Sequence, residues 1–146
     1  MSYTNFLYHI VFGTKSRLPL ISDEVKPRLH QYLGGTVRGL GGIALEINGM
    51  PDHVHLLVKL KPTTKFSDFL RDLKSNSSAW AKENGIRQFS WQRRYGAFTV
   101  SESQMKIVRN YIHTQEEHHR KFDFQTEFET LLISNGIKVD EFVWQD

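Results

Sequence analysis

The sequence contains no cysteine among its 146 residues. Disulfide bonds and thiolate metal sites are therefore excluded, and a cytoplasmic protein is the simplest expectation. The longest apolar runs, such as residues 10–12, are far too short to cross a bilayer. The N-terminus also has no charged start followed by a long apolar stretch, so neither a signal peptide nor a membrane partner is predicted.

Several catalytic signatures are missing as well. There is no P-loop and no glycine-rich Rossmann fingerprint, so no nucleotide cofactor is predicted. There is no Gly-x-Ser-x-Gly elbow for serine chemistry, and the aromatic signature of RNA-recognition sheets is absent. A His-x-His pair is present, but the barrel hydrolases that open metal sites with such a pair need about 250 residues.

What is present suits one folded domain with an uneven charge. The length and a hydrophobic content of 39% fit a single catalytic domain, residues 1–146, with one core. The net charge is +3, yet residues 59–94 carry nine Lys or Arg against three Asp or Glu, while residues 116–146 carry eight acids against three bases. The basic segment predicts a phosphate-binding surface. The plainer alternative is a solvated helix face.

Hydropathy periodicity predicts alternating strands and helices. Strands are expected where apolar, aromatic and β-branched side chains dominate or alternate, at residues 3–12, 43–47, 53–60 and 95–101. Helices are expected between capping and glycine signals, from Ser22 to Gly41, from Thr63 to Gly85, from Gln104 to about His118 and from Phe124 to Asn135. Residues 137–144 are expected to form an irregular tail.

This order predicts an α+β fold. It corresponds to a ferredoxin-like split βαβ core, with an antiparallel sheet and helices on one face, plus C-terminal helices. The Gly-Met-Pro-Asp sequence at residues 49–52 forms the turn of a β-hairpin. On the strand that follows, Val54 and Leu56 face one way and His53 and His55 the other. The histidine face is therefore expected to be exposed.

Two short patterns could together form a metal-assisted site. His53 and His55 lie two apart on a strand and project from one face. Tyr111 and Gln115 lie four apart on a helix and also share a face. Two imidazole nitrogens and an amide oxygen can hold a divalent cation, and a tyrosine beside that cation can attack phosphorus.

Each pattern also has a plainer interpretation. Paired histidines on a strand are more often surface or hydrogen-bonded residues, and Tyr111 falls on an apolar stripe that suits the core. A buried Gln115 needs a partner, for which a backbone group is commoner than a metal. His113 lies about 200° around the helix from Tyr111 and is not counted as a ligand. A second metal site at His118 and His119 is disfavoured.

Residues 89–98 interleave aromatic residues with arginines. Aromatic rings can stack unpaired bases, and guanidinium groups can neutralise phosphates. The predicted nucleic-acid-binding residues in and beside this segment are therefore Arg87, Trp91, Arg93 and Arg94. The alternative for Trp91 is a place in the core.

Taken in order, these motifs resemble the single-tyrosine transposases of the insertion sequence 200/605 group, which carry a histidine–hydrophobic–histidine (HUH) signature. The resemblance rests on Met-Pro-Asp-His-Val-His-Leu-Leu-Val at residues 50–58, on Trp-Gln at 91–92 with Tyr-Gly-Ala-Phe at 95–98, and on Tyr-Ile at 111–112 with Gln115 and the histidines at 118–119. It covers residues 3–144. One departure is Arg94, near which the family pattern has a glycine.

The resemblance implies a metal-dependent enzyme that cleaves and rejoins single-stranded DNA. Mg²⁺ or Mn²⁺ would be held by His53, His55 and Gln115. Tyr111, on the C-terminal helices, would attack the DNA and leave a 5′-phosphotyrosine and a free 3′-hydroxyl. No ATP is needed, because the bond energy is kept in the phosphotyrosine.

The resemblance also implies the partners. These are single-stranded DNA with hairpins and a second copy of the chain, in a homodimer that could share its tyrosines between subunits. The apolar character of the first strand, residues 7–12, separately suggests that this strand pairs across the two-fold axis. The alternative function is that of a non-cutting or host-adapted relative that binds or processes DNA hairpins of repeat sequences.

Overall fold

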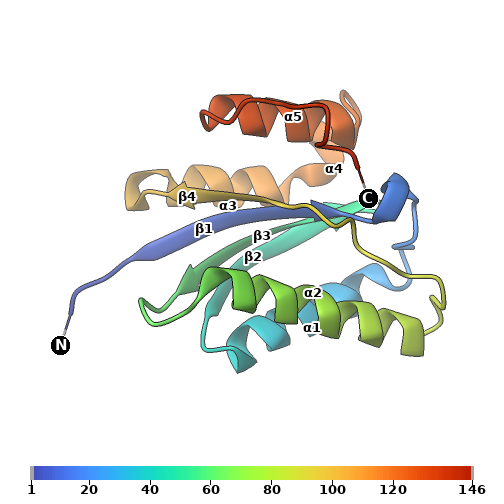
Figure 1. Cartoon of the computed structure of the whole chain (residues 1–146), viewed down its shortest axis with the longest axis horizontal. Helices are drawn as coiled ribbons and strands as arrows, with labels where there is room; N and C mark the ends of the chain where they lie inside the picture. The colour runs from blue at the N-terminus through green and yellow to red at the C-terminus, as the bar shows by residue number, and fades with distance from the viewer. Residues whose placement is uncertain (1, 146) are drawn as a thin grey trace.

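The computed structural model describes residues 2–145 and places a four-stranded sheet between two layers of helices (Figure 1). The strands, all antiparallel to their neighbours and in the order β2-β3-β1-β4, are β1 (Phe6–Gly13), β2 (Ile43–Met50), β3 (His53–Leu60) and β4 (Gly96–Val100). The helices are α1 (Lys26–Gly39), α2 (Phe66–Glu83), α3 (Met105–His113), α4 (Gln115–His118) and α5 (Phe124–Ser134), with 3₁₀ turns at Lys15–Arg17 and Glu102–Gln104. None of the described helices has the length and apolar character that crossing a membrane requires.

The predicted fold is confirmed by this topology. α1 and α2 are the crossover helices of a split βαβ arrangement, and both lie on the same face of the sheet (Figure 1). The apolar side chains at every second position of β3, including Val54 and Leu56, pack there against the helical stripes, which include Leu29 of α1 and Leu73 of α2. All four of these side chains are fully buried.

Local signals define the ends of α1 and α5. The Ser22 hydroxyl accepts a hydrogen bond from the Val25 N–H at 3.3 Å just before α1 begins, and Gly41, with a φ of 90°, follows the end of that helix. At the start of α5, the Asp123 carboxylate accepts the N–H of Thr126 at 2.9 Å. These ends agree with the sequence expectations to within a few residues.

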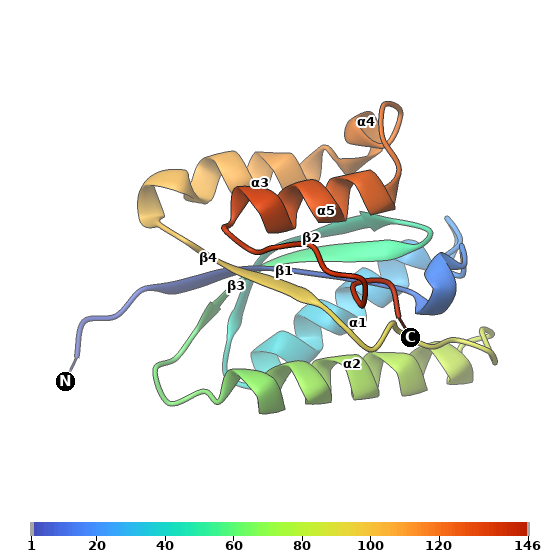
Figure 2. The same cartoon turned by 45° about the horizontal axis from the view of Figure 1, so that its top comes forward.

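The histidine face of the sheet is not exposed, and that prediction is wrong. α3, α4 and α5 lie over it (Figures 1 and 2). A second apolar cluster, containing Phe124 and Phe128 of α5 together with Val11 and Phe98, seals this layer. Because α5 docks there through its own apolar stripe, no surface of the His53 or His55 side chains reaches solvent.

The single helix expected from Gln104 to about His118 is divided at Thr114. This residue has φ −102° and ψ 31°, outside the helical region, and separates α3 from α4. Its hydroxyl donates to the carbonyl of Asn110 at 2.9 Å, a local bond that competes with regular helix geometry. Gln115 consequently starts a new helix instead of continuing the Tyr111 helix.

The expected role of the first strand in dimer pairing is also wrong. β1 lies inside the sheet, with β3 on one side and β4 on the other. Its backbone groups are therefore engaged within the chain. The outer strands of the sheet are β2 and β4.

Candidate active site

The two histidines of β3 point into the layer between the sheet and the C-terminal helices. Their side chains share a face because successive strand residues alternate. In the ladder, His53 is paired with Gly13 of β1 and Met50 of β2. The ring of His53 stacks on that of Phe124 at 4.1 Å, with 5° between the planes. The first residue of α5 therefore fixes the orientation of this imidazole.

The carboxylate of Glu127, on α5, lies where three imidazole rings converge. Its Oε1 atom is 3.0 Å from His55 Nε2, 3.2 Å from His53 Nε2 and 3.0 Å from His119 Nε2. Its Oε2 atom accepts a short hydrogen bond from the Tyr111 hydroxyl. Glu127 is only 5% exposed, so these contacts form in a nearly dry environment.

The outer nitrogens of both β3 histidines have their own partners. His53 Nδ1 lies 2.7 Å from Asp52 Oδ1, and His55 Nδ1 lies 2.8 Å from His9 Nε2. If a cation replaced the Nε2 proton that now faces Glu127, Asp52 and His9 could each accept the Nδ1–H of the ring beside them. A metal-bound histidine usually has such a partner on its second ring nitrogen.

Tyr111 and Gln115 reach the same cluster from either side of the break at Thr114. Gln115 is fully buried, its Nε2 donates to Glu127 at 3.0 Å, and its Oε1 lies 3.1 Å from His53 Nε2. The Tyr111 ring stacks on that of His118 at 4.5 Å. The structure thus brings together, within one chain, all four residues predicted for the nucleophile and the metal. His113, which was not counted as a ligand, is exposed and points to Glu46.

Two members of the cluster were missed or undervalued from the sequence. Glu127 was not singled out, although it falls on the apolar stripe of α5 between Phe124 and Phe128, where a charged residue is unusual. His119 was assigned to a disfavoured second site. It lies four residues after Gln115 and therefore points in nearly the same direction.

Burial sets the protonation states of the cluster. It lowers the pKa of His9 to about 3 and that of His55 to about 4, so both rings are neutral near pH 7. Burial also opposes charge on His53, but hydrogen bonds to Asp52 and Glu127 outweigh it and raise the pKa. The pKa of Tyr111 is raised by burial and by the charge of Glu127, so its hydroxyl keeps its proton.

Glu127 remains ionised despite its environment. Burial favours the neutral acid, but hydrogen bonds from His119, His53 and His55 dominate and hold the pKa of Glu127 well below its usual range. The cluster therefore contains an anion surrounded by donors. Most of these donors carry no full positive charge of their own.

The donor chemistry fits a divalent cation. Ligand atoms of His53, His119 and Glu127 all lie within 4.8 Å of one another. Imidazole nitrogen, carboxylate oxygen and amide oxygen are ligands of Mn²⁺, and the oxygens also suit Mg²⁺. His53, His55 and Gln115 could hold such an ion, with Asp52 and His9 orienting the rings.

Trp91 does not serve as a base-stacking residue. It is 7% exposed, packs edge-on against Phe12 and Phe89, and donates its indole N–H to the Ser77 hydroxyl at 2.9 Å. The alternative interpretation, a place in the core, is the correct one. The neighbouring arginines favoured an exposed position for Trp91. In the structure the arginines are exposed, whereas the Trp91 side chain points into the core.

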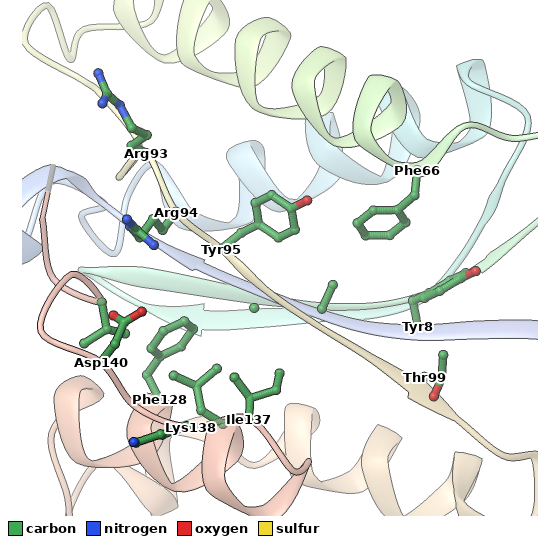
Figure 3. Close-up of a pocket in the computed structure, with 14 residues that line it drawn as sticks. Tyr8, Phe66, Arg93, Arg94, Tyr95, Thr99, Phe128, Ile137, Lys138 and Asp140 are labelled. Atoms are coloured by element: carbon green, nitrogen blue, oxygen red, sulfur yellow. The ribbon is translucent and has the colours of Figure 1, made fainter.

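The predicted arginines are exposed, and two of them line a cleft beside β4. The cleft has a volume of about 650 Å³. Figure 3 shows the rings of Tyr95 and Phe66 neighbouring one another in it, with Arg93 and Arg94 toward the end away from Phe66. Tyr95 is 40% exposed, so it offers the accessible aromatic surface that Trp91 does not. Arg87 is not part of this lining.

Comparison with known proteins gives the family. A sequence model described as "Transposase IS200 like" matches residues 2–115. The chain belongs to the IS200-like transposase family. The resemblance seen in its motifs is thereby confirmed, and family membership identifies the chain as a DNA transposase. The matched segment ends at Gln115, so His119 and Glu127 lie beyond it.

Two transposases are similar to this chain in sequence over most of its length. The chain is 31% identical over 119 residues to the ISDra2 transposase TnpA of Deinococcus radiodurans, covering 75% of this chain and 84% of that protein. It is 30% identical over 120 residues to the transposase of the insertion sequence element IS200 of Salmonella typhimurium, covering 77% and 79%.

Solved structures share the fold. A crystal structure described as a transposase from Deinococcus radiodurans has a TM-score of 0.65 and 27% identity, and the match covers 78% of this chain and 93% of that one. A REP-associated tyrosine transposase bound to a REP hairpin has a TM-score of 0.58 at 16% identity, with 77% and 67% covered. The second likeness concerns the fold alone.

Proposed function

We propose that this transposase cleaves and rejoins single-stranded DNA, with Tyr111 as the nucleophile and a divalent cation bound beside it. The observation that carries this proposal is the convergence of the Tyr111 hydroxyl and the two β3 histidines on one buried carboxylate. A tyrosine that only filled space would not need its hydroxyl directed at a cluster of potential metal ligands.

In the proposed reaction, the Tyr111 oxygen attacks the scissile phosphorus in line with the leaving 3′-oxygen. A bond forms between the tyrosine oxygen and phosphorus, and the bond from phosphorus to the 3′-oxygen breaks. The Tyr111 hydroxyl loses a proton in this step, and the leaving 3′-oxygen gains one to become a hydroxyl. Mg²⁺ or Mn²⁺, when bound, stabilises charge on the phosphate oxygens. His118 holds the phenol ring by stacking, and Asp52 and His9 orient the imidazoles.

Rejoining follows from the same geometry. The 5′-phosphotyrosine keeps the energy of the broken bond, so the 3′-hydroxyl of another strand can attack it and restore Tyr111. No nucleotide cofactor is consumed in either step.

We propose that the cleft beside β4 holds part of the DNA. Arg93 and Arg94 supply positive charge, and Tyr95 supplies an accessible ring for an unpaired base. Arg87 is a more distant phosphate contact. The REP-associated transposase that shares this fold is bound to a hairpin, which suggests that the strand bound here also carries a hairpin.

We further propose a homodimer in which each active site is built within one chain. The support is that Tyr111 already reaches the histidines of its own chain. Co-expressing a Tyr111→Phe chain with a His53→Ala/His55→Ala chain tests this arrangement. Sites built within one chain give no recovery of activity, whereas recovered cleavage would show that sites are shared between subunits.

The main test is covalent capture of DNA. A labelled single-stranded oligonucleotide with Mn²⁺ should yield a protein–DNA adduct that Tyr111→Phe abolishes, while the fold and DNA binding persist. His113→Ala is a matched control on the same helix, because that side chain lies outside the cluster. An adduct that survives in Tyr111→Phe would refute the assignment of the nucleophile. Binding without any cleavage by the unaltered chain would favour the non-cutting alternative.

A further inference from the structure

Glu127 is a buried carboxylate on the apolar face of α5, where packing alone does not require a charged residue. Its neighbours along the α5 stripe are apolar, and a leucine or methionine there would continue the packing of Phe124 and Phe128. A carboxylate in that position must instead be desolvated, which is unfavourable unless charge and hydrogen bonds compensate. The nearest rings include His55, which is itself fully buried. A bound cation would give this buried carboxylate a direct partner of opposite charge.

The distances show where that cation would lie. The Nε2 atoms of His53, His55 and His119 are 3.0–3.2 Å from a single point, the Oε1 atom of Glu127. These are hydrogen-bond lengths, whereas a divalent cation takes its nitrogen and oxygen ligands at about 2.0–2.3 Å. A cation therefore fits at or near the point now occupied by Oε1, with small inward shifts of the rings.

We propose that Glu127 is a ligand of the divalent cation in this transposase, together with His53, His55 and His119. This inference rests on the proposed metal-dependent function and adds Glu127 and His119 to the ligands His53, His55 and Gln115. The Glu127 carboxylate would hold the ion through Oε1.

The second carboxylate oxygen gives this ligand a further consequence. Oε2 accepts hydrogen bonds from the Tyr111 hydroxyl and from Gln115 Nε2. One side chain therefore connects the cation to the nucleophile and fixes the distance between them. Gln115 orients the carboxylate in this arrangement, while its own oxygen remains directed toward His53.

The competing interpretation is that Glu127 only blocks the site. In that case the carboxylate competes with the cation, and removing its charge should strengthen metal binding. If it is a ligand, removing its charge should weaken binding. The two roles thus predict opposite signs for the same measurement.

The experiment is calorimetric titration of the DNA-free protein with Mn²⁺. Glu127→Gln preserves the size of the side chain and should weaken Mn²⁺ binding by at least about tenfold, the lower end of the effects seen when groups around a metal site are lost. Glu117→Gln is the matched control: it removes the same charge from an exposed position on α4 and should leave the affinity unchanged. Equal or tighter binding by Glu127→Gln would overturn the inference.

Two further variants keep the test decisive. If Glu127→Gln does not fold, Glu127→Asp retains the charge on a side chain shorter by one methylene; weaker binding supports a ligand, and tighter binding indicates a block. His53→Ala/His55→Ala should remove Mn²⁺ binding. Loss of binding there, with Glu127→Gln unaffected, overturns this inference alone. Absence of Mn²⁺ binding by the unaltered chain overturns both this inference and the proposed metal dependence.

Discussion

Gly49, on β2, offers the sharpest test of the structure around the histidines. It pairs with Val54 across the β2–β3 hairpin and precedes the turn that leads into His53. A Cβ atom added at Gly49 would lie 2.2 Å from the His53 carbonyl oxygen and 2.9 Å from Val54 Cα. Both obstacles are backbone atoms, so no side-chain rotation relieves the contact. Gly49→Ala should therefore force the two strands apart.

The size of the effect follows from these distances. A carbon–oxygen contact is comfortable at about 3.3 Å, so the strands must separate locally by roughly 1 Å. Hydrogen bonds near 2.9 Å do not survive such a shift, and each contributes about 0.5–1.5 kcal/mol. Overpacking adds about 1–3 kcal/mol. Gly49→Ala should thus lower the free energy of unfolding by roughly 2–4 kcal/mol.

Chemical denaturation of the metal-free protein measures this directly. Gly39→Ala is the matched control, because Gly39 ends α1 and a Cβ there meets nothing within 4 Å in the part of the chain that the structure describes. The same substitution should stabilise at Gly39 by about 0.5 kcal/mol or more, since alanine is the better helix former. If the Gly49→Ala protein were as stable as the unaltered chain, β2 and β3 could not pack as closely at Gly49 as the structure shows. The displaced His53 should also weaken Mn²⁺ binding.

Three further predictions concern charge. Arg93→Ala and Arg94→Ala should each flatten the salt dependence of single-stranded DNA binding by about 0.7 in the log–log slope, and an unchanged slope in the double variant would show a merely solvated surface. Mn²⁺ affinity should fall by up to about tenfold per pH unit once the pH drops below the raised pKa of His53, because binding displaces its proton; a pH-independent titration would contradict this. Burial lowers the pKa of His30 to about 4, and its Nε2 has no hydrogen-bond partner among residues 2–145. The unfolded chain therefore takes up this proton first as the pH falls below about 6.5, so stability declines toward pH 4 by up to about 1.4 kcal/mol per unit, and His30→Leu should decline less steeply in denaturation curves.

The fold was largely accessible from the sequence because its signals are local. The alternation along β3 separates Val54 from His53 without reference to any other element, and the capping residue Ser22 marks the start of the first helix. Which face α5 covers is not a local property. It depends on Phe124 stacking on His53, a contact between residues far apart in sequence, so the burial of the histidine face could not be derived from periodicity.

The site was accessible only in part for a related reason. The spacings of His53 with His55 and of Tyr111 with Gln115 define shared faces within one element, but nothing in either spacing places the two faces together. The break at Thr114 and the return of α5 do so. Glu127 had one usable signal, a carboxylate on an apolar stripe, whereas the role of His119 depends on α4 being a separate helix.

The closure of the histidine layer has a consequence for the order in which a substrate meets the site. Because His53, His55 and Gln115 are all fully covered in this conformation, a phosphate group that arrives at the surface meets none of them. A cleft of about 530 Å³ between α3 and α5 reaches Tyr111 and His9 but stops short of the inner imidazoles. A phosphate group held in this cleft meets the Tyr111 and His9 side chains before any other member of the cluster. The order of contact is therefore fixed by the covering of the layer: the nucleophile is reached from outside, while the imidazoles that would hold the ion are shielded from solvent.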